Sequence, residues 1–326
     1  MRILAGIIVV MLGLLVALTL VIIFGPREPT DPPITFQPEA IGPDPEAYLS
    51  NSEAKIGGIR ADVRKRIVWT DPSSRDRTRR VLVYLHGFSA TSEEIRPVPD
   101  RVAAELGANI VYTRLTGHGR DGTALAEARF SNWMNDVAEA LFVAKRIGDE
   151  VVVIGTSTGA SLAVTAVGRP DLAPMIDALV LISPNFRVAN PRAEALRLPY
   201  VRLWGPMVFG RVRSLTPINS AHGKYWTTTY PAVATVSMAT AVAAANAVDF
   251  SAQTKPALFI FDPADRVVDH RRTREIAAAW GGRADLQTVN VGPQDDPSAH
   301  VIAGDILSPS MTEPITRMIV EWVKGL

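Results

Sequence analysis

The most constraining feature of this chain is a run of β-branched residues that leads directly into a short turn flanked by glycines. Val151–Ile154 is followed by residues 155–159, with the sequence G-T-S-T-G, and then by an alanine-rich stretch typical of a helix that ends near Gly168. In a strand–turn–helix unit of this kind, the glycines permit a turn too sharp for larger residues, and the serine hydroxyl projects beyond the edge of the sheet. Ser157 is therefore the candidate nucleophile.

A serine hydroxyl is a weak nucleophile that needs a base to remove its proton and an acid to orient that base. Ala257–Phe261 predicts a buried strand that opens into a loop with Asp262 and Asp265, and Leu286–Val291 predicts a later strand followed by a polar loop with His300. The candidates thus occur in the chain order Ser, Asp, His, which differs from the orders of other serine hydrolase folds.

With these motifs in place, the chain resembles an α/β-hydrolase of the carboxylesterase and monoacylglycerol lipase type, a group that also includes serine aminopeptidases of the S33 type. The resemblance begins near Arg80, and its motifs are Leu85-His86-Gly87-Phe88, Arg114-Leu115-Thr116-Gly117-His118-Gly119, Trp133–Leu141, the G-T-S-T-G turn, Asp265-Arg266-Val267-Val268 and Ser298-Ala299-His300. It implies a mostly parallel sheet with helices on both faces and a helical cap inserted over the active site.

The resemblance also implies roles for individual residues. The backbone N–H groups of Phe88 and Thr158 would bind the oxyanion, and His300 would be the base. The family places its acid in a Gly-x-x-Asp-x-x-Val setting, which favours Asp265 over Asp262 and, more distantly, Asp269. Asp262 stands where the family usually has glycine, so the residues alone leave the choice of acid open.

The remaining histidines have simpler interpretations. His86 and His118 lie in loops that usually pack beside the active site in this family, so they are expected to be structural. His222 and His270 stand among polar residues and are expected to be exposed to solvent.

Alternating strand and helix patterns extend through most of the chain and predict the elements of the sheet and its covering layers. We predict strands at Val63–Trp69, Val81–Leu85, Asn109–Leu115, Val151–Ile154, Leu179–Ile182, Ala257–Phe261 and Leu286–Val291. We predict helices at Glu93–Leu106, Asn132–Arg146, Ser157–Gly168, His270–Trp280 and Thr312–Lys324.

No metal or organic cofactor is expected. The chain has no cysteine, no His-x-x-x-His pair and no glycine-rich phosphate loop. Its 34 basic and 33 acidic residues give a net charge of +1, which argues against a nucleic-acid partner because no field of one sign covers the protein.

The N-terminus predicts a membrane span. Residues 3–24 carry no charge, and a helix of this length extends about 33 Å, enough to cross a bilayer core. Residues 1–25 are interpreted as an uncleaved transmembrane anchor, with a signal sequence cleaved on secretion as the alternative. Arg2 and the amino terminus favour a cytoplasmic N-terminus, which places the enzyme domain outside. The proline-rich residues 26–55 predict a tether that holds the catalytic domain, residues 56–326, off the membrane.

The pattern of strands and helices is interrupted at about residues 184–254, where the family inserts its cap. Because a cap overlies the active site, apolar residues in this insertion are candidates for the lining of an acyl pocket. The first candidates are Leu203, Trp204, Met207 and Phe209.

The leading functional hypothesis is a membrane-anchored serine esterase or lipase that acts on lipophilic carboxylic esters. A peptidase or an acyltransferase with the same triad is the alternative within this chemistry, because the pocket determines the leaving group and the acceptor. A third hypothesis is a catalytically silent, membrane-tethered scaffold. The oligomeric state and the natural substrate are not determined by these patterns.

Overall fold

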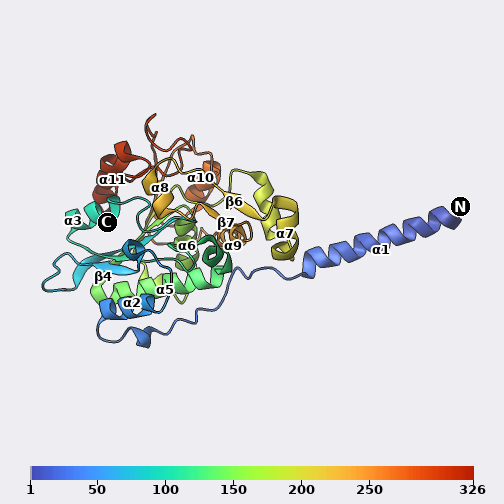
Figure 1. Ribbon diagram of the computed structural model, residues 1–326. Coiled ribbons are helices and arrows are strands. Elements are labelled where there is room, and N and C mark those ends of the chain that lie inside the picture. The colour runs from blue at the N-terminus through green and yellow to red at the C-terminus, as the bar shows by residue number, and fades with distance from the viewer. Residues whose placement is uncertain (1) are drawn as a thin grey trace.

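The computed structural model describes residues 2–326 and has a seven-stranded, mostly parallel sheet at its centre (Figure 1). The strands lie in the order β1-β3-β2-β4-β5-β8-β9, and only β1 is antiparallel to its neighbour. Their bounds are β1 (Arg66–Val68), β2 (Thr78–Leu85), β3 (Asn109–Tyr112), β4 (Gly148–Thr156), β5 (Ala178–Ile182), β8 (Ala257–Phe261) and β9 (Ala284–Thr288). The prediction of a mostly parallel sheet is confirmed.

Helices cover both faces of this sheet because successive side chains of each strand point in opposite directions. On β2, Leu82 and Tyr84 pack in the cluster formed with α3 and α11, whereas Val81, Val83 and Leu85 pack in the cluster formed with the helices of the other face. The first face carries α3 (Val98–Leu106) and α11 (Thr312–Lys324); the second carries α5 (Phe130–Ile147), α6 (Thr158–Val167) and α10 (His270–Ala279).

Several predicted boundaries differ from those in the structure, among them the end of the strand predicted at 109–115, which is Tyr112, and two of the differences have local causes. α3 begins at Val98 rather than Glu93, because Pro97 and Pro99 lack the N–H of a helix interior and disfavour helical geometry in the preceding residue. β9 ends at Thr288 rather than Val291, since the Val291 N–H donates to the Asp262 carboxylate at 2.7 Å instead of extending the sheet.

Between β5 and β8 the chain forms a mainly helical insertion. Its elements are η4 (Pro191–Arg197), α7 (Val201–Phe209), β6 (Val212–Ser214), α8 (Ser220–Tyr225), β7 (Thr229–Pro231) and α9 (Ala234–Asn246). α9 packs against α6. The segment before β7 is held to the loop after β2, because the Thr227 N–H donates to the Ser89 carbonyl at 2.7 Å. The insertion therefore adjoins both the helix that follows Ser157 and the loop that contains Phe88.

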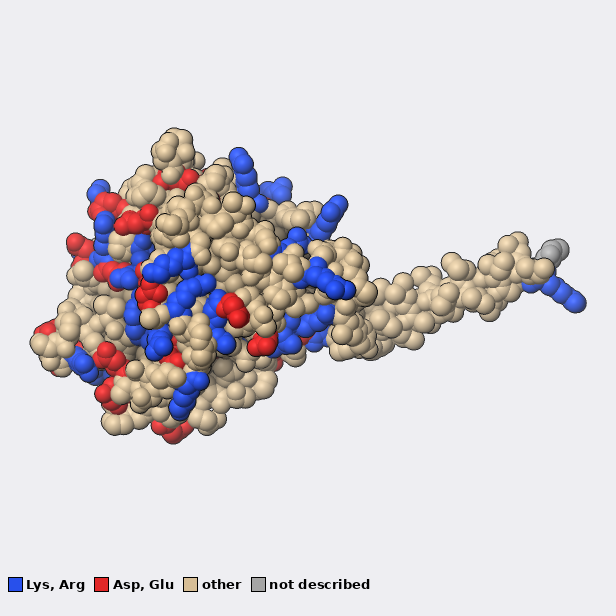
Figure 2. Space-filling view, in the orientation of Figure 1, with Lys and Arg blue, Asp and Glu red and all other residues tan. Residues whose placement is uncertain are grey.

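The N-terminal helix α1 (Arg2–Phe24) extends away from the body of the protein (Figure 1). None of its residues is buried, and within the described residues 2–326 it is the one helix long and apolar enough to cross a membrane. Figure 2 shows it as a rod that is uncharged up to its tip, in contrast to the mixed charges of the body.

The segment that follows α1 lies on the body of the protein. The Asn135 side chain on α5 accepts hydrogen bonds from the N–H groups of Thr35 and Phe36, both at 2.8 Å. Further along, α2 (Pro45–Ala54) contributes Glu53 to a buried ion pair with Arg114 at 2.7 Å. Residues 26–55 are therefore not a free extended segment, because polar and ionic contacts fix them along the domain.

The remaining short elements connect these layers. They are η1 (Pro38–Ile41), η2 (Ala61–Val63), α4 (Gly122–Glu127), η3 (Ala173–Met175) and η5 (Pro309–Met311).

Candidate active site

Ser157 occupies the sharp turn between β4 and α6. Its backbone has φ 52° and ψ −114°, a conformation that is strained for a residue with a side chain, and its N–H donates to the Ile182 carbonyl on the neighbouring β5 at 2.9 Å. Gly159 lets α6 approach β2 closely: a Cβ atom there would lie 2.0 Å from the Leu85 carbonyl oxygen. The turn thus depends on both a strained serine and a residue without a side chain.

We expect Gly159→Ala to lower the free energy of unfolding by about 3 kcal/mol or more, because its methyl group would overlap backbone atoms that cannot move freely. Chemical denaturation of the full chain in detergent measures this difference. Gly57→Ala is the matched control, since a Cβ atom there meets nothing within 4 Å, and it should change stability by less than about 0.5 kcal/mol. Equal stabilities of the two variants would contradict this account of the turn.

The fold brings Ser157, His300 and Asp265 together although they lie far apart in the sequence. Nε2 of His300 lies 3.0 Å from Oγ of Ser157, and Nδ1 of His300 lies 2.8 Å from Oδ2 of Asp265. The Asp265 side chain is fully buried, and its second oxygen accepts from the N–H groups of Val267 and Val268 at 2.7 and 3.0 Å. The carboxylate is thereby fixed in the orientation that meets the imidazole.

The other two candidate acids have different partners. Asp262 is buried, and its carboxylate accepts from the backbone N–H groups of Ala264 and Val291, each at 2.7 Å. Asp269 caps the N-terminus of α10 and pairs with Arg271 and Arg187. Of the three aspartates, Asp265 is the one whose carboxylate is hydrogen-bonded to His300.

A fourth aspartate, absent from our sequence predictions, shapes the loop that carries His300. One oxygen of Asp296 accepts from the N–H groups of His300 and Val301 at 3.1 and 2.8 Å, and the other accepts from the Ser298 N–H at 3.0 Å. Its position four residues before the histidine, in a polar loop, is the one signal for it in the sequence. Asp296 therefore positions the imidazole through the backbone.

The surroundings of His300 favour its protonated form. Burial lowers the pKa of the imidazole, but the charges and hydrogen bonds of the surrounding carboxyl groups, chiefly Asp265, together outweigh burial, so that the pKa of His300 lies above its usual value. The carboxyl groups of Glu94 and Asp296 act in the same direction. An imidazole in this environment stabilises the cation that forms when it takes a proton from a serine hydroxyl.

Phe88 lies in the loop after β2, and Thr158 follows Ser157 as the first residue of α6. Among residues 2–326, neither of their backbone N–H groups has a protein acceptor. The turn before Phe88 is fixed by His86, whose Nδ1–H donates to the Gly87 carbonyl at 2.9 Å and whose Nε2 accepts from the Leu115 N–H at 3.1 Å. Burial lowers the pKa of His86 to about 4, so its ring is neutral near pH 7.

The other histidines are placed by packing. His118 is buried, and its ring packs edge-on against Phe88, with the centroids 6.0 Å apart. The expectation that His222 is exposed is wrong, because its ring is buried against Trp226 and its Nδ1 accepts from the Ile218 N–H. His270 is half-buried beside Phe261.

Glu94 is a further buried acid that sequence reasoning missed. Its Oε2 accepts from the Gly87 N–H at 2.8 Å and from the Tyr84 hydroxyl at 3.0 Å. Burial raises the pKa of this carboxyl group to about 7. No spacing in the sequence reveals Glu94. Its contacts depend on a turn at residues 93–97, where we predicted the start of a helix.

The insertion meets this site through residues other than the predicted ones. The Asn185 N–H donates to the Ser157 carbonyl at 3.1 Å, and the Tyr230 ring packs edge-on against Phe88 at 5.4 Å. Leu203 and Met207 are 73% and 77% exposed on the outer side of α7, so the expectation that they line an acyl pocket is wrong for this structure.

The two aromatic candidates on α7 pack locally. The rings of Trp204 and Phe209 lie 5.7 Å apart, and the Trp204 indole N–H donates to the Pro199 carbonyl at 2.7 Å. As for metal ligands, no group of three or more His, Asp or Glu side chains within residues 2–326 is arranged to hold an ion.

Comparisons with known proteins agree with this architecture. The sequence model of the family described as "Serine aminopeptidase, S33" matches residues 76–290. No curated protein matches the chain.

Among solved structures, one reported for the metagenome-derived lipolytic enzymes LipS and LipT is 19% identical, with a TM-score of 0.66 over 82% of this chain and 100% of the other. A soluble variant of monoglyceride lipase from Saccharomyces cerevisiae is 13% identical, with a TM-score of 0.61 over 80% of this chain and 90% of the other. The monoacylglycerol lipase of Paleococcus ferrophilus is 16% identical, with a TM-score of 0.57 over 79% and 96%. At these identities the likeness shows a shared fold.

Proposed function

The chain belongs to the S33 serine aminopeptidase family of α/β-hydrolases, and we propose that it hydrolyses carboxylic esters of lipophilic substrates through Ser157, His300 and Asp265. The observation that carries this proposal is the continuous pair of contacts from Ser157 Oγ to His300 Nε2 at 3.0 Å and from His300 Nδ1 to Asp265 Oδ2 at 2.8 Å. The unpaired N–H groups of Phe88 and Thr158 support it, because they are available for an oxyanion.

In the proposed mechanism Ser157 attacks the ester carbonyl while His300 takes the hydroxyl proton. Asp265 holds the imidazole with Nε2 toward the serine and stabilises the imidazolium. The N–H groups of Phe88 and Thr158 bind the negative oxygen of the tetrahedral intermediate, and His300 returns the proton to the departing alcohol. Water then attacks the acyl-enzyme with His300 as base, which releases the carboxylic acid and restores the serine.

The acids around His300 favour esters over peptides with a free N-terminus. An aminopeptidase needs a carboxylate that is available for the substrate's ammonium group. Glu94 is buried, with a pKa of about 7, and binds the Gly87 N–H and the Tyr84 hydroxyl. Asp296 accepts hydrogen bonds from the N–H groups of Ser298, His300 and Val301 and from the Ser298 hydroxyl, all in its own loop. Both groups are thus occupied by internal contacts.

Three features support a lipophilic substrate. Phe88 is half-buried among the rings of Tyr230, His118 and Trp133. The S-methyl-bearing side chain of Met238 reaches Asn185, next to the serine, with its sulfur 3.3 Å from the amide nitrogen. The structural relatives include proteins named as lipolytic enzymes and monoacylglycerol lipases.

We expect p-nitrophenyl esters to be cleaved by the full chain in detergent, with kcat/KM rising with acyl length over short and medium chains, and aminoacyl p-nitroanilides to be cleaved at least about 100-fold more slowly. The reason is that each methylene of the acyl chain gains about 0.8 kcal/mol of binding free energy when it is fully buried, whereas Glu94 and Asp296 are already occupied by internal hydrogen bonds and do not offer a carboxylate to an ammonium group. Initial rates measured by absorbance give both values, with Ser157→Ala as the blank. Faster cleavage of the anilides would establish the peptidase alternative.

We further propose that α1 is an uncleaved anchor and that the enzyme domain lies outside the cytoplasm, with secretion after signal cleavage as the alternative. Arg2 lies on one side of α1, and on the other side the charge of Arg27 is offset by those of Glu28 and Asp31, which supports this orientation. Glu28 lies four residues beyond the end of α1 and is hydrogen-bonded to the enzyme domain. These contacts support a chain in which α1 stays attached to the domain.

A further inference from the structure

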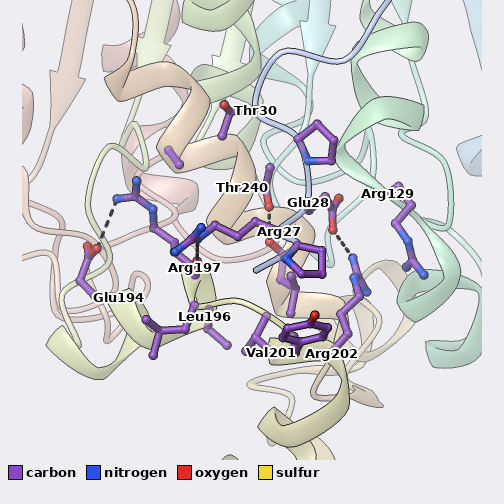
Figure 3. Close-up of a pocket in the computed structure, with 16 residues that line it drawn as sticks. Arg27, Glu28, Thr30, Arg129, Glu194, Leu196, Arg197, Val201, Arg202 and Thr240 are labelled. Carbon is purple, nitrogen blue, oxygen red and sulfur yellow. Dashed lines mark hydrogen bonds and ion pairs between the residues drawn. The ribbon is translucent and has the colours of Figure 1, made fainter. Parts of the chain in front are cut away.

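A cavity of about 540 Å³ lies where the segment after α1 meets the insertion (Figure 3). Its walls come from residues 26–30, the start of α5, η4, α7 and one side of α9. Four arginines and two glutamates line it: Arg27, Arg129, Arg197, Arg202, Glu28 and Glu194.

This cavity is separate from the candidate active site because α9 stands between them. Val236, Thr240 and Ala243 of α9 line the cavity. Met238 lies on another side of the same helix and reaches Asn185, whose N–H binds the Ser157 carbonyl. The cavity therefore has no part in the proposed ester cleavage.

The lining carries a positive formal charge, with four basic and two acidic side chains. Arg202 pairs with Glu28, and Arg197 pairs with Glu194 at 3.4 Å (Figure 3). The Arg129 guanidinium contacts three backbone carbonyls at 3.3–3.5 Å and, within residues 2–326, forms no ion pair. Burial lowers the pKa of Arg129 and the nearby charge of Arg202 lowers it further, while the charge of Glu28 opposes this shift without reversing it.

Glu28 fixes this cavity relative to α1. Its side chain is 8% exposed and accepts from the Phe130 N–H at the start of α5 at 2.5 Å and from the Ser237 hydroxyl on α9 at 2.9 Å, in addition to its pair with Arg202 on α7. Because Glu28 follows α1 so closely, these contacts hold the end of the apolar helix beside the cavity.

Two further contacts place the cavity at the level where α1 ends. The Tyr200 N–H donates to the Pro26 carbonyl at 3.1 Å, and the Arg27 guanidinium contacts the Gly25 carbonyl and the Arg197 carbonyl. Figure 2 shows basic side chains on the body near the base of the α1 rod.

An exposed apolar surface on α7 lies next to the cavity and the end of α1. Leu203, Met207 and Val208 on α7 are 73%, 77% and 66% exposed, and α7 lies near the inner end of α1 in Figure 1. Arginines beside exposed apolar side chains are typical of a protein surface that contacts the interface of a bilayer.

We propose that this cavity binds the phosphate group of an anionic phospholipid in the leaflet from which α1 emerges, while the exposed side chains of α7 contact the adjacent acyl chains. The proposal rests on the membrane-anchor part of the proposed function and is independent of ester hydrolysis. A lipid headgroup is favoured over free phosphate because the apolar surface of α7 and the end of α1 adjoin the arginines. Arg129 provides a positive charge that, within residues 2–326, forms no ion pair, and Arg27 and Arg202 line the same cavity.

Native mass spectrometry of the full chain in detergent tests this proposal, with phosphatidylglycerol, phosphatidylcholine or inorganic phosphate added separately. We expect the protein to retain phosphatidylglycerol in preference to phosphatidylcholine. Arg129→Ala should weaken phosphatidylglycerol binding about fivefold, the effect typical of one basic side chain near an anionic surface. Arg192→Ala, which removes an exposed arginine of η4 that does not line the cavity, should leave binding within about twofold.

Arg197→Ala is a second test variant, since its side chain is 53% exposed and its removal should not prevent folding. Equal retention of phosphatidylglycerol and phosphatidylcholine would contradict the proposed site. Unchanged phosphatidylglycerol binding in both Arg129→Ala and Arg197→Ala would contradict it as well. If an equal concentration of inorganic phosphate displaced phosphatidylglycerol, the cavity would bind free phosphate rather than a lipid headgroup, and the proposal would be wrong. Ester hydrolysis by the same samples separates these outcomes from a failure of the proposed function, because the arginine variants should retain normal activity.

Discussion

Replacing Ser157 with alanine is expected to lower kcat for p-nitrophenyl esters roughly 10⁶-fold, the size of loss typical when the nucleophile of such a triad is removed. The hydroxyl is the group that would form the covalent bond, and its Oγ lies 3.0 Å from the His300 Nε2 that would take its proton. Water attack aided by the remaining N–H groups would leave a small residual rate. Steady-state kinetics on the full chain in detergent measure the difference.

Ser161→Ala is the matched control for this variant. Ser161 lies in the first turn of α6, just after Ser157, and is also buried, but its hydroxyl donates to the Asn185 carbonyl at 2.6 Å and does not contact His300. We expect its kcat to remain within about tenfold of the parent. If the Ser157 variant kept activity comparable to that of the Ser161 variant, the assignment of the nucleophile would be wrong.

Replacing Asp265 with asparagine is expected to lower kcat about 10⁴-fold, because an amide no longer fixes the imidazole in the tautomer that accepts a proton at Nε2. The pH profile should change as well. Catalysis requires neutral His300, so the rate of the parent rises with pH through a midpoint above about 6.5, since Asp265 raises the imidazole pKa. Removal of the charge lowers that pKa, and the midpoint should move to lower pH.

Asp262→Asn and Asp269→Asn distinguish the three candidate acids. Asp262 binds two backbone N–H groups, so its variant should lose stability without a shift in the pH midpoint. Asparagine at position 269 can still cap α10 but loses the ion pairs with the exposed arginines, so this variant should lose less than about 1 kcal/mol of stability. A shift of the pH midpoint in the Asp262 variant, with none in the Asp265 variant, would move the acid to position 262. Thermal unfolding of each variant provides the stability control.

The architecture of the sheet could be predicted because it depends on local patterns. Val151–Ile154 and Ala257–Phe261 are continuous apolar runs, as expected for strands buried on both faces, and both lie in central strands of the sheet. The turn at Ser157 follows from the two glycines that flank it. The ends of elements were less predictable, since Val291 leaves the strand for a contact with Asp262 that no local pattern reveals.

The surroundings of the site depend on contacts that the sequence does not encode locally. Glu94 and Asp296 look like surface acids in the sequence, yet both are buried through hydrogen bonds to distant or looped backbone groups. An apolar helix has the same pattern whether it faces a pocket or a membrane, so the outward direction of Leu203 on α7 could not be inferred. The docking of residues 26–55 likewise required Asn135 and Arg114 of the folded domain.

The measurement that tests the central claim most directly is labelling of the full chain with a fluorophosphonate, followed by peptide mapping of the adduct. A serine activated by His300 should displace fluoride and form a phosphonate ester at Ser157 with a stoichiometry near one, and His300→Ala should abolish this labelling in folded protein. A folded parent protein that carries no adduct, or one that carries it at another serine, would contradict the account.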